Sequence, residues 1–233
     1  FERAVPIAPA RWLLIELGRF RFRQTERWIP ETYRDELAGI ALGFRPDPFE
    51  YVLPSYHRFV FLYTLYDIAL SYEKSPLIGC TTFTIPPSSN EPPHEPSPVG
   101  VPTLGPSPSG EPAADAPSPH AASADWATRT AGHGFLARNF DFETSDVFDH
   151  DKVVFLVREP GRIPFLSVGW PGFIGVVSGM NREGVAMVVH GGRASTPEPA
   201  GIPVVFSLRE ALSRARTTQE AVDVLSAQRV MVS

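Results

Sequence analysis

The chain has 233 residues, 43% of them hydrophobic and 20% charged, an ordinary balance for one large globular domain or two small ones. The formal net charge of −5, with Lys and Arg scattered along the chain, argues against nucleic-acid binding. The single cysteine cannot form an intramolecular disulfide, and no apolar run approaches the roughly 20 residues that a membrane span needs.

The N-terminal part is expected to be helical over much of residues 10–43, because apolar residues recur there at helical spacing. Pro30 followed by Glu31 is typical of the first turn of a helix, and Gly43 is typical of its end. Residues 56–70 are rich in aromatic side chains, which predicts that this segment packs in a core.

A Pro-rich stretch at about residues 86–125 interrupts the globular composition. It contains almost no large apolar residues, so it predicts a disordered or polyproline-like insertion. The entropy cost of closing a loop grows only logarithmically with its length. We therefore expect that the strand around Cys80 and a strand starting near Gly134 can be neighbours in space.

Short strands are expected after this insertion, at residues 134–141, 153–158, 165–168, 172–178 and 185–190, with a hairpin turn at 179–184. Two helices should follow, one running from Phe206 to Ala215. The second should open with a capping box made by Thr217 and Glu220. Helices, then antiparallel strands, then helices indicate an α+β layered fold.

Cys80 lies in the stretch Ile-Gly-Cys-Thr-Thr-Phe at residues 78–83. A thiol inside a chain is a weak nucleophile until a base takes its proton. Attack of the Cys80 thiol on the Gly79 carbonyl would split the chain and free an α-amino group. Such an amine has a reference pKa of about 7.7 to 8.0 and can serve as that base. The alternative is that Cys80 is a small buried hydrophobe.

Five segments carry a resemblance to a known family. They are residues 31–43 (ETYRDELAGIALG), 79–83 (GCTTF), 137–142 (ARNFDF), 178–184 (SGMNREG), and 201–203 (GIP) running into 208–210 (LRE). Together they resemble the acyl-coenzyme A:6-aminopenicillanic acid acyltransferase family of N-terminal-nucleophile hydrolases, related to choloylglycine hydrolases and acid ceramidases. The resemblance implies a four-layer αββα sandwich, incomplete in this chain. It also implies a helical propeptide or α-chain at residues 1–79 and the start of the catalytic chain at residues 80–233.

The same resemblance implies a site. Cys80 matches the nucleophile that is exposed when the precursor cuts itself after Gly79, and Arg138 and Asp141 match the family's Arg-Asn-x-Asp strand. A carboxylate can hold the new amine, and a guanidinium favours a thiolate. Asn181 matches an Asn whose amide can donate to an oxyanion. The alternatives are a solvated ion pair for Arg138 with Asp141 and, for Asn181, a place in the turn because asparagine tolerates a positive φ.

The function indicated is a self-processing cysteine amidase, peptidase or acyltransferase that acts on a small N-acyl or peptide substrate through a thioester. The alternative is an inactive or interaction module that keeps the fold. We expect the two cleaved chains to associate with each other. Related enzymes continue beyond the point that matches Ser233, so either the remainder lies on a separate C-terminal fragment, which would be a further partner, or the chain is a truncated piece. The histidines share no metal-ligand spacing, and we expect neither metal nor organic cofactor. The start at Phe1 is compatible with a removed signal and a secreted or periplasmic protein, and it leaves the compartment undetermined.

Overall fold

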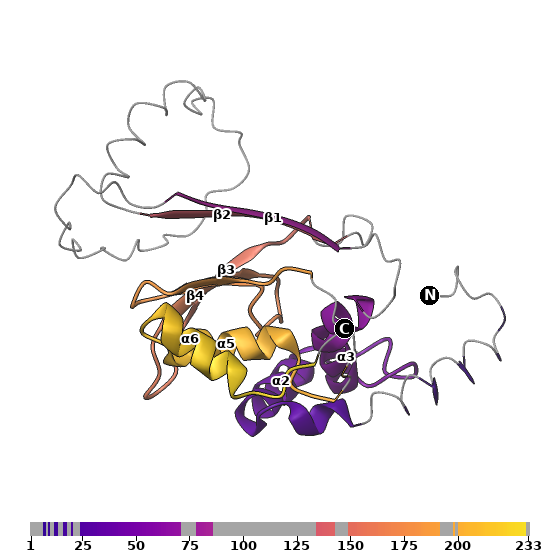
Figure 1. Ribbon diagram of the computed structural model, residues 1–233. Coiled ribbons are helices and arrows are strands. Elements are labelled where there is room, and N and C mark those ends of the chain that lie inside the picture. The colour runs from indigo at the N-terminus through magenta and orange to yellow at the C-terminus, as the bar shows by residue number, and fades with distance from the viewer. Residues whose placement is uncertain are drawn as a thin grey trace, which may run out of the picture. The chain divides into compact units, whose positions relative to one another are not determined.

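The computed structural model describes residues 24–70, 78–85, 134–142, 149–191, 198 and 200–231, together with isolated positions between 7 and 20. Its contacts divide the chain into two units, residues 1–80 with 140–233 and residues 81–139. Figure 1 shows the elements of both units. The predicted Pro-rich insertion lies outside the described residues.

From residue 24 onward, the described residues of the first unit form five helical segments: η1 (Thr25–Trp28), α2 (Glu31–Gly43), α3 (Ser55–Leu70), α5 (Val204–Arg214) and α6 (Thr218–Ser226). Helix α2 begins directly after Pro30 and ends at Gly43, as the sequence predicts. Thr217 caps α6, because its hydroxyl accepts a hydrogen bond of 3.1 Å from the backbone N–H of Glu220. The Glu220 carboxylate accepts in turn from the N–H of Arg216 at 2.7 Å. Local capping signals therefore placed these helix ends correctly.

A four-stranded antiparallel sheet follows in the order β3 (Val153–Val157), β4 (Phe165–Gly169), β5 (Ser178–Asn181) and β6 (Ala186–Val188). Burial alternates along β4, with Phe165 and Ser167 buried and Leu166 and Val168 exposed. Helix α5 contacts β5 and β6. A Cβ on Gly179 would lie 2.7 Å from the Leu212 side chain, so glycine permits this close approach of strand and helix.

The prediction of a strand at residues 172–178 is wrong. Residues 172–177 form a loop, and only Ser178 belongs to a strand, as the first residue of β5: the N–H of Phe173 bonds to the carbonyl of Trp170, and Gly172 has a φ of +77°. The apolar character that suggested a strand reflects burial, since Val176 and Val177 lie in the core. The hairpin turn is also shorter than expected, because residues 178–181 form β5 and the turn is left to residues 182–184.

The core of the first unit joins helices from both ends of the chain. The ring of Tyr33 on α2 stacks on Phe206 of α5, with centroids 5.4 Å apart. Phe206 also stacks on Tyr63 of α3 at 4.8 Å, and Tyr63 stacks on Phe173 at 5.0 Å. Tyr33, Tyr63 and Phe206 are among the largest fully buried side chains. The predicted core role of the aromatic segment is confirmed for Tyr63, and the helices before Cys80 pack with those after it.

A second sheet consists of β1 (Ile78–Ile85) and β2 (Phe135–Phe142), which are hydrogen-bonded neighbours (Figure 1). This pairing confirms that the strand of Cys80 and the strand starting near Gly134 lie side by side despite their separation in sequence. The chain is thus a mixed α+β fold with two sheets, as predicted. Among the described residues, no helix has both the length and the apolar character of a membrane span.

Candidate active site

Strands β1 and β2 carry three of the four predicted site residues. Cys80 is the third residue of β1 and is partly buried, and Arg138, on β2, is partly buried as well. Asp141 follows three positions later on β2. Its neighbour Phe140 packs against the core, with its ring 5.8 Å from that of Trp170. The fold therefore pairs the cysteine strand with the Arg-Asn-x-Asp strand, and the catalytic roles of the three residues stay predictions.

Asn181, the fourth predicted residue, lies at the end of β5 with 4% of its surface exposed. Its side-chain oxygen accepts hydrogen bonds from the backbone N–H groups of Glu183, at 3.1 Å, and Val185, at 2.9 Å. Its side-chain nitrogen donates to the carbonyl oxygens of Leu212, at 2.9 Å, and Ala215, at 2.7 Å. One amide thus connects the β5–β6 turn to the C-terminal end of α5.

These four bonds define what Asn181 does in this structure. A side-chain amide has two hydrogens to donate, and both are directed at backbone carbonyls that the helix end leaves without helical partners. Donation to an oxyanion would require release of one buried bond, at a cost of about 1–3 kcal/mol. The four bonds give Asn181 a structural role between the β5–β6 turn and the end of α5. Asn181 is the last residue of β5 and does not have a positive φ, so tolerance of that conformation does not explain the residue, and its role as an oxyanion donor stays a prediction.

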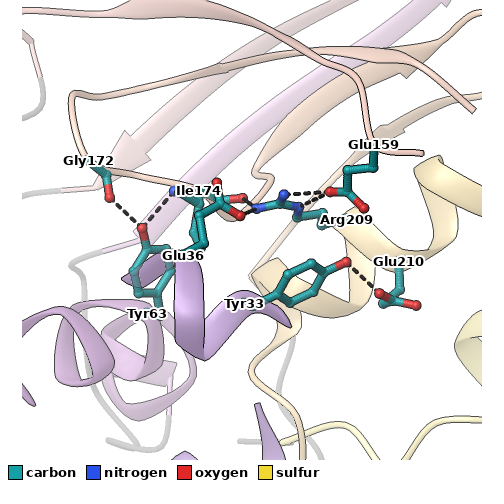
Figure 2. A network of polar contacts seen from close by, with 8 residues as sticks. All are labelled: Tyr33, Glu36, Tyr63, Glu159, Gly172, Ile174, Arg209 and Glu210. Atoms are coloured by element: carbon teal, nitrogen blue, oxygen red, sulfur yellow. Dashed lines mark hydrogen bonds and ion pairs between the residues drawn. The ribbon is translucent and has the colours of Figure 1, made fainter. Parts of the chain in front are cut away.

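Arg209, on α5, is only 3% exposed and lies at the centre of a network of charged side chains. Its guanidinium donates to the Ile174 carbonyl at 2.9 Å and lies 2.8 Å from the Glu36 carboxylate (Figure 2). Two further bonds, of 3.1 and 2.5 Å, reach one oxygen of Glu159. Burial alone would lower the pKa of Arg209, and the two carboxylates more than offset this and raise it. The guanidinium is therefore held charged and paired.

Tyr33 extends this network to the next residue of α5. The Arg209 guanidinium lies 4.4 Å from the centre of the Tyr33 ring, a cation–π distance. The Tyr33 hydroxyl donates to Glu210 at 2.5 Å, and the other oxygen of Glu210 pairs with Arg214 at 2.6 Å. Burial, and then the bond to Glu210, raises the pKa of the Tyr33 hydroxyl. The neutral phenol is thus a fixed donor between α2 and α5.

Tyr63 holds the loop between β4 and β5 from the side of α3. Its hydroxyl donates to the Gly172 carbonyl at 2.6 Å and accepts from the Ile174 N–H at 2.6 Å (Figure 2). Because Arg209 binds the carbonyl of the same Ile174, the loop is fixed through both polar groups of one residue. Groups on α3 and α5 together set the loop that leads into β5.

Sequence reasoning missed this network as a unit. Two of the segments that carry the family resemblance, residues 31–43 and 208–210, contain Tyr33, Glu36, Arg209 and Glu210. Tyr33 and Glu210 are in contact although they lie 177 positions apart in the sequence, and no local sequence pattern predicts such a contact. The available signal was an Arg-Glu pair inside an otherwise apolar helix, since buried charges require partners. The network contains no cysteine or serine nucleophile. Its hydrogen bonds and ion pairs connect α2 to α5, which is a structural role.

Asp67, on α3, is a buried carboxyl with 5% of its surface exposed. One of its oxygens accepts a bond of 3.3 Å from the N–H of Val204, the first residue of α5. Burial raises the pKa of Asp67 to about 8, and the bond from Val204 acts in the opposite direction. Among the residues that the structure describes, no group of three or more His, Cys, Asp or Glu side chains could hold a metal ion.

Comparison with known families gives one finding. Residues 128–233 match the model of the family described as acyl-coenzyme A:6-aminopenicillanic acid acyl-transferase, which confirms the predicted resemblance over this range. The matched range includes Arg138, Asp141, Asn181 and Arg209, and it starts after Cys80. The chain matches no curated protein and no solved structure.

Proposed function

We propose, on the premise that residues 128–233 belong to the acyl-coenzyme A:6-aminopenicillanic acid acyl-transferase family, that this protein is a self-processing cysteine amidohydrolase or acyltransferase. Family membership suggests N-terminal-nucleophile chemistry on amide bonds. The observation that carries the assignment of Cys80 is the pairing of β1, which holds the only cysteine, with β2, which holds Arg138 and Asp141.

Maturation would begin at the bond between Gly79 and Cys80. The Cys80 thiol adds to the Gly79 carbonyl, the peptide C–N bond breaks, and the acyl group passes from nitrogen to sulfur. The released amino group takes up a proton. Water then hydrolyses the thioester, which leaves a carboxylate on Gly79 and a free thiol on Cys80.

Turnover would use the new terminus. The α-amino group of Cys80 accepts the thiol proton, and the thiolate attacks the carbonyl of an N-acyl substrate. The leaving amine takes a proton as the C–N bond breaks, and water or another amine resolves the thioester. Asp141 would hold the terminal ammonium, and Arg138 would favour the thiolate by its charge.

The segment before the cleavage bond would stay bound after maturation. Helices α2 and α3 contribute Tyr33 and Tyr63 to the core, and Glu36 pairs with Arg209. Loss of this segment would expose apolar surface and leave a buried guanidinium short of a partner. We therefore propose that residues 1–79 act as a retained α-chain.

A complete αββα sandwich is part of the proposal. One face of the β3–β6 sheet exposes a row of apolar side chains: Val154, Leu156, Leu166, Val168 and Met180. The strand register places Val154 opposite Val168, Leu156 opposite Leu166, and Leu166 opposite Met180. An apolar patch of this kind indicates a surface that another layer covers. We propose that a further layer of the family fold covers this face.

The deciding experiment is the intact mass of the purified chain. Maturation predicts two products, residues 1–79 and 80–233, that copurify under native conditions. Cys80→Ala should give one folded precursor, whereas the neighbouring Thr81→Ala, at an exposed position of the same strand, should split normally. Cleavage of the Cys80→Ala protein at Gly79 without added protease would contradict the mechanism.

A second measurement separates an enzyme from an inactive module. The matured protein should hydrolyse at least one member of a panel of N-acyl amino acids, fatty amides and short peptides. Alkylation of Cys80 by iodoacetamide should abolish that activity. An unprocessed chain that is inactive against the whole panel would instead favour the interaction module.

A further inference from the structure

A cavity of about 670 Å³ lies where three segments of the first unit meet. They are the β3–β4 connection, the β5–β6 turn and the end of α5. The lining residues are Gly161, Arg162, Ile163, Pro164, Arg182, Glu183, Ser213, Arg214 and Arg216. None of them belongs to the predicted catalytic set, so the proposed amide chemistry does not account for this cavity.

Backbone hydrogen bonds hold the walls of the cavity together. The N–H of Ile163 donates to the Ser213 carbonyl at 2.9 Å, and the N–H of Arg182 donates to the Pro164 carbonyl at 2.9 Å. Asn181 adds its two bonds to the end of α5. The three segments are therefore mutually fixed, and the cavity is part of the fold.

The charge of the lining is strongly unbalanced. Four arginines face one lining carboxylate, Glu183, in a protein whose formal net charge is −5. Glu210 is not a lining residue, but it pairs with Arg214 at 2.6 Å and lies 3.8 Å from Arg162. The Glu220 carboxylate accepts a bond of 2.7 Å from the backbone N–H of Arg216. Even with these two further carboxylates, the four arginines outnumber the three acidic residues around the cavity.

Two of the four arginines keep their donors available. Within the part of the chain that the structure describes, the guanidinium groups of Arg182 and Arg216 make no hydrogen bond or ion pair with another residue. Both residues are exposed. Each guanidinium offers five N–H groups in a planar fork that matches the oxygens of a phosphate. Both guanidinium groups are therefore available to an anion with several oxygens.

We propose that this cavity, lined by Arg162, Arg182, Arg214 and Arg216, binds a small compound that carries two or more phosphate charges. Its volume lies within the range of small-molecule sites. Its lining is polar and charged, which excludes a purely apolar ligand. Charge-assisted hydrogen bonds from arginine to phosphate oxygens are roughly twice as strong as bonds between neutral groups, and they are frequently bidentate.

Calorimetric titration of the full chain with inorganic pyrophosphate, at fixed ionic strength, tests the proposal. We expect saturable binding to the wild type. The double variant Arg182→Gln/Arg216→Gln should weaken that binding by about tenfold or more, because two charged forks are lost. The affinity of Arg182→Lys/Arg216→Lys for pyrophosphate should lie between those of the wild type and the double Gln variant, since lysine keeps the charge and lacks the planar fork.

Arg229→Gln is the matched control. Arg229 is also exposed and pairs with Glu198 outside the cavity, so its loss should leave pyrophosphate binding unchanged. A second arm uses phosphatidylcholine vesicles with and without phosphatidic acid. Recovery of the wild type on the phosphatidic acid vesicles, with loss in the double Gln variant, would identify a lipid headgroup as the phosphate source. Absence of both saturable pyrophosphate binding and such vesicle binding in the wild type, or equal pyrophosphate binding in the double Gln variant, would overturn the proposal.

Discussion

Charged side chains have different surroundings along helix α5: they are buried and paired in its first part and border an open cavity at its C-terminal end. At its start, Asp67 is buried against the first N–H of the helix, and at its middle, Arg209 is buried and paired with carboxylates. At its C-terminal end, a neutral amide from Asn181 binds the backbone, and Arg214 and Arg216 border an open cavity. The difference shows that the same residue type can fix the structure where burial forces pairing and stay available for a ligand where it does not.

Removal of Arg209 should have the largest effect on stability. Arg209→Gln would leave Glu36 and Glu159 without their shared cation, and removing one partner of a buried pair typically costs about 3–5 kcal/mol. Because the Glu36 and Glu159 side chains are 41% and 26% exposed and solvent can reach them, we expect a loss at the lower end of this range. Urea unfolding at neutral pH measures this loss. Arg229→Gln, which removes an arginine from an exposed pair, should change the unfolding midpoint little. Equal effects in the two variants would erase the contrast between buried and exposed arginines.

The Arg209 network also shows which parts of the structure the sequence could predict. Helix ends at Pro30, Gly43 and Thr217 depend on neighbours in the chain, and these predictions were confirmed. The pairing of Tyr33 with Glu210 depends on how distant segments pack, and no local pattern carries that information. The wrong strand at residues 172–178 has the same origin, because a buried loop and a buried strand are equally apolar.

The candidate site likewise contains one feature that the sequence predicted and one that it did not. The pairing of the Cys80 strand with the strand of Arg138 and Asp141 was predicted, because a long insertion adds little closure entropy. The contacts of Asn181 were not predicted. The sequence motif Gly-x-Asn-x-x-Gly is the same whether the Asn amide binds a substrate or the end of α5. Only the position of the packed helix shows which of these two partners the amide has.

Asn181→Ala should be the next most damaging change. The variant loses both bonds to the end of α5 and leaves the buried N–H of Val185 without its side-chain acceptor, so we expect a loss of about 3 kcal/mol. Thermal unfolding measures it. Arg182→Ala, at the exposed next position of the same turn, is the control. A folded Asn181→Ala protein of normal stability that matures but fails to acylate would instead support the oxyanion role.

Asp67 should make stability depend on pH. Its folded pKa of about 8 lies above the reference value of 3.8, so the folded state keeps a proton that the unfolded state releases. The contribution is complete below about pH 4 and is lost as the pH rises toward 8, at about 1.4 kcal/mol per pH unit. Asp67→Asn removes the titration, so its unfolding free energy between pH 5 and 8 should be flatter than that of the wild type. Parallel pH profiles would show that the carboxyl is ionised throughout.

The smallest effect on stability should come from the arginines at the open end of α5. Arg182 and Arg216 are exposed, so Arg182→Gln/Arg216→Gln should change the free energy of unfolding by no more than about 0.5 kcal/mol. The comparison with Arg209 becomes sharp when the same samples are titrated with pyrophosphate. The double variant should keep its unfolding free energy and lose ligand-induced stabilisation, because a ligand stabilises only the state that binds it. A large loss of stability without ligand would mean that Arg182 and Arg216 stabilise the folded structure, as Arg209 does. The contrast along α5 between structural arginines and arginines available to a ligand would then be wrong.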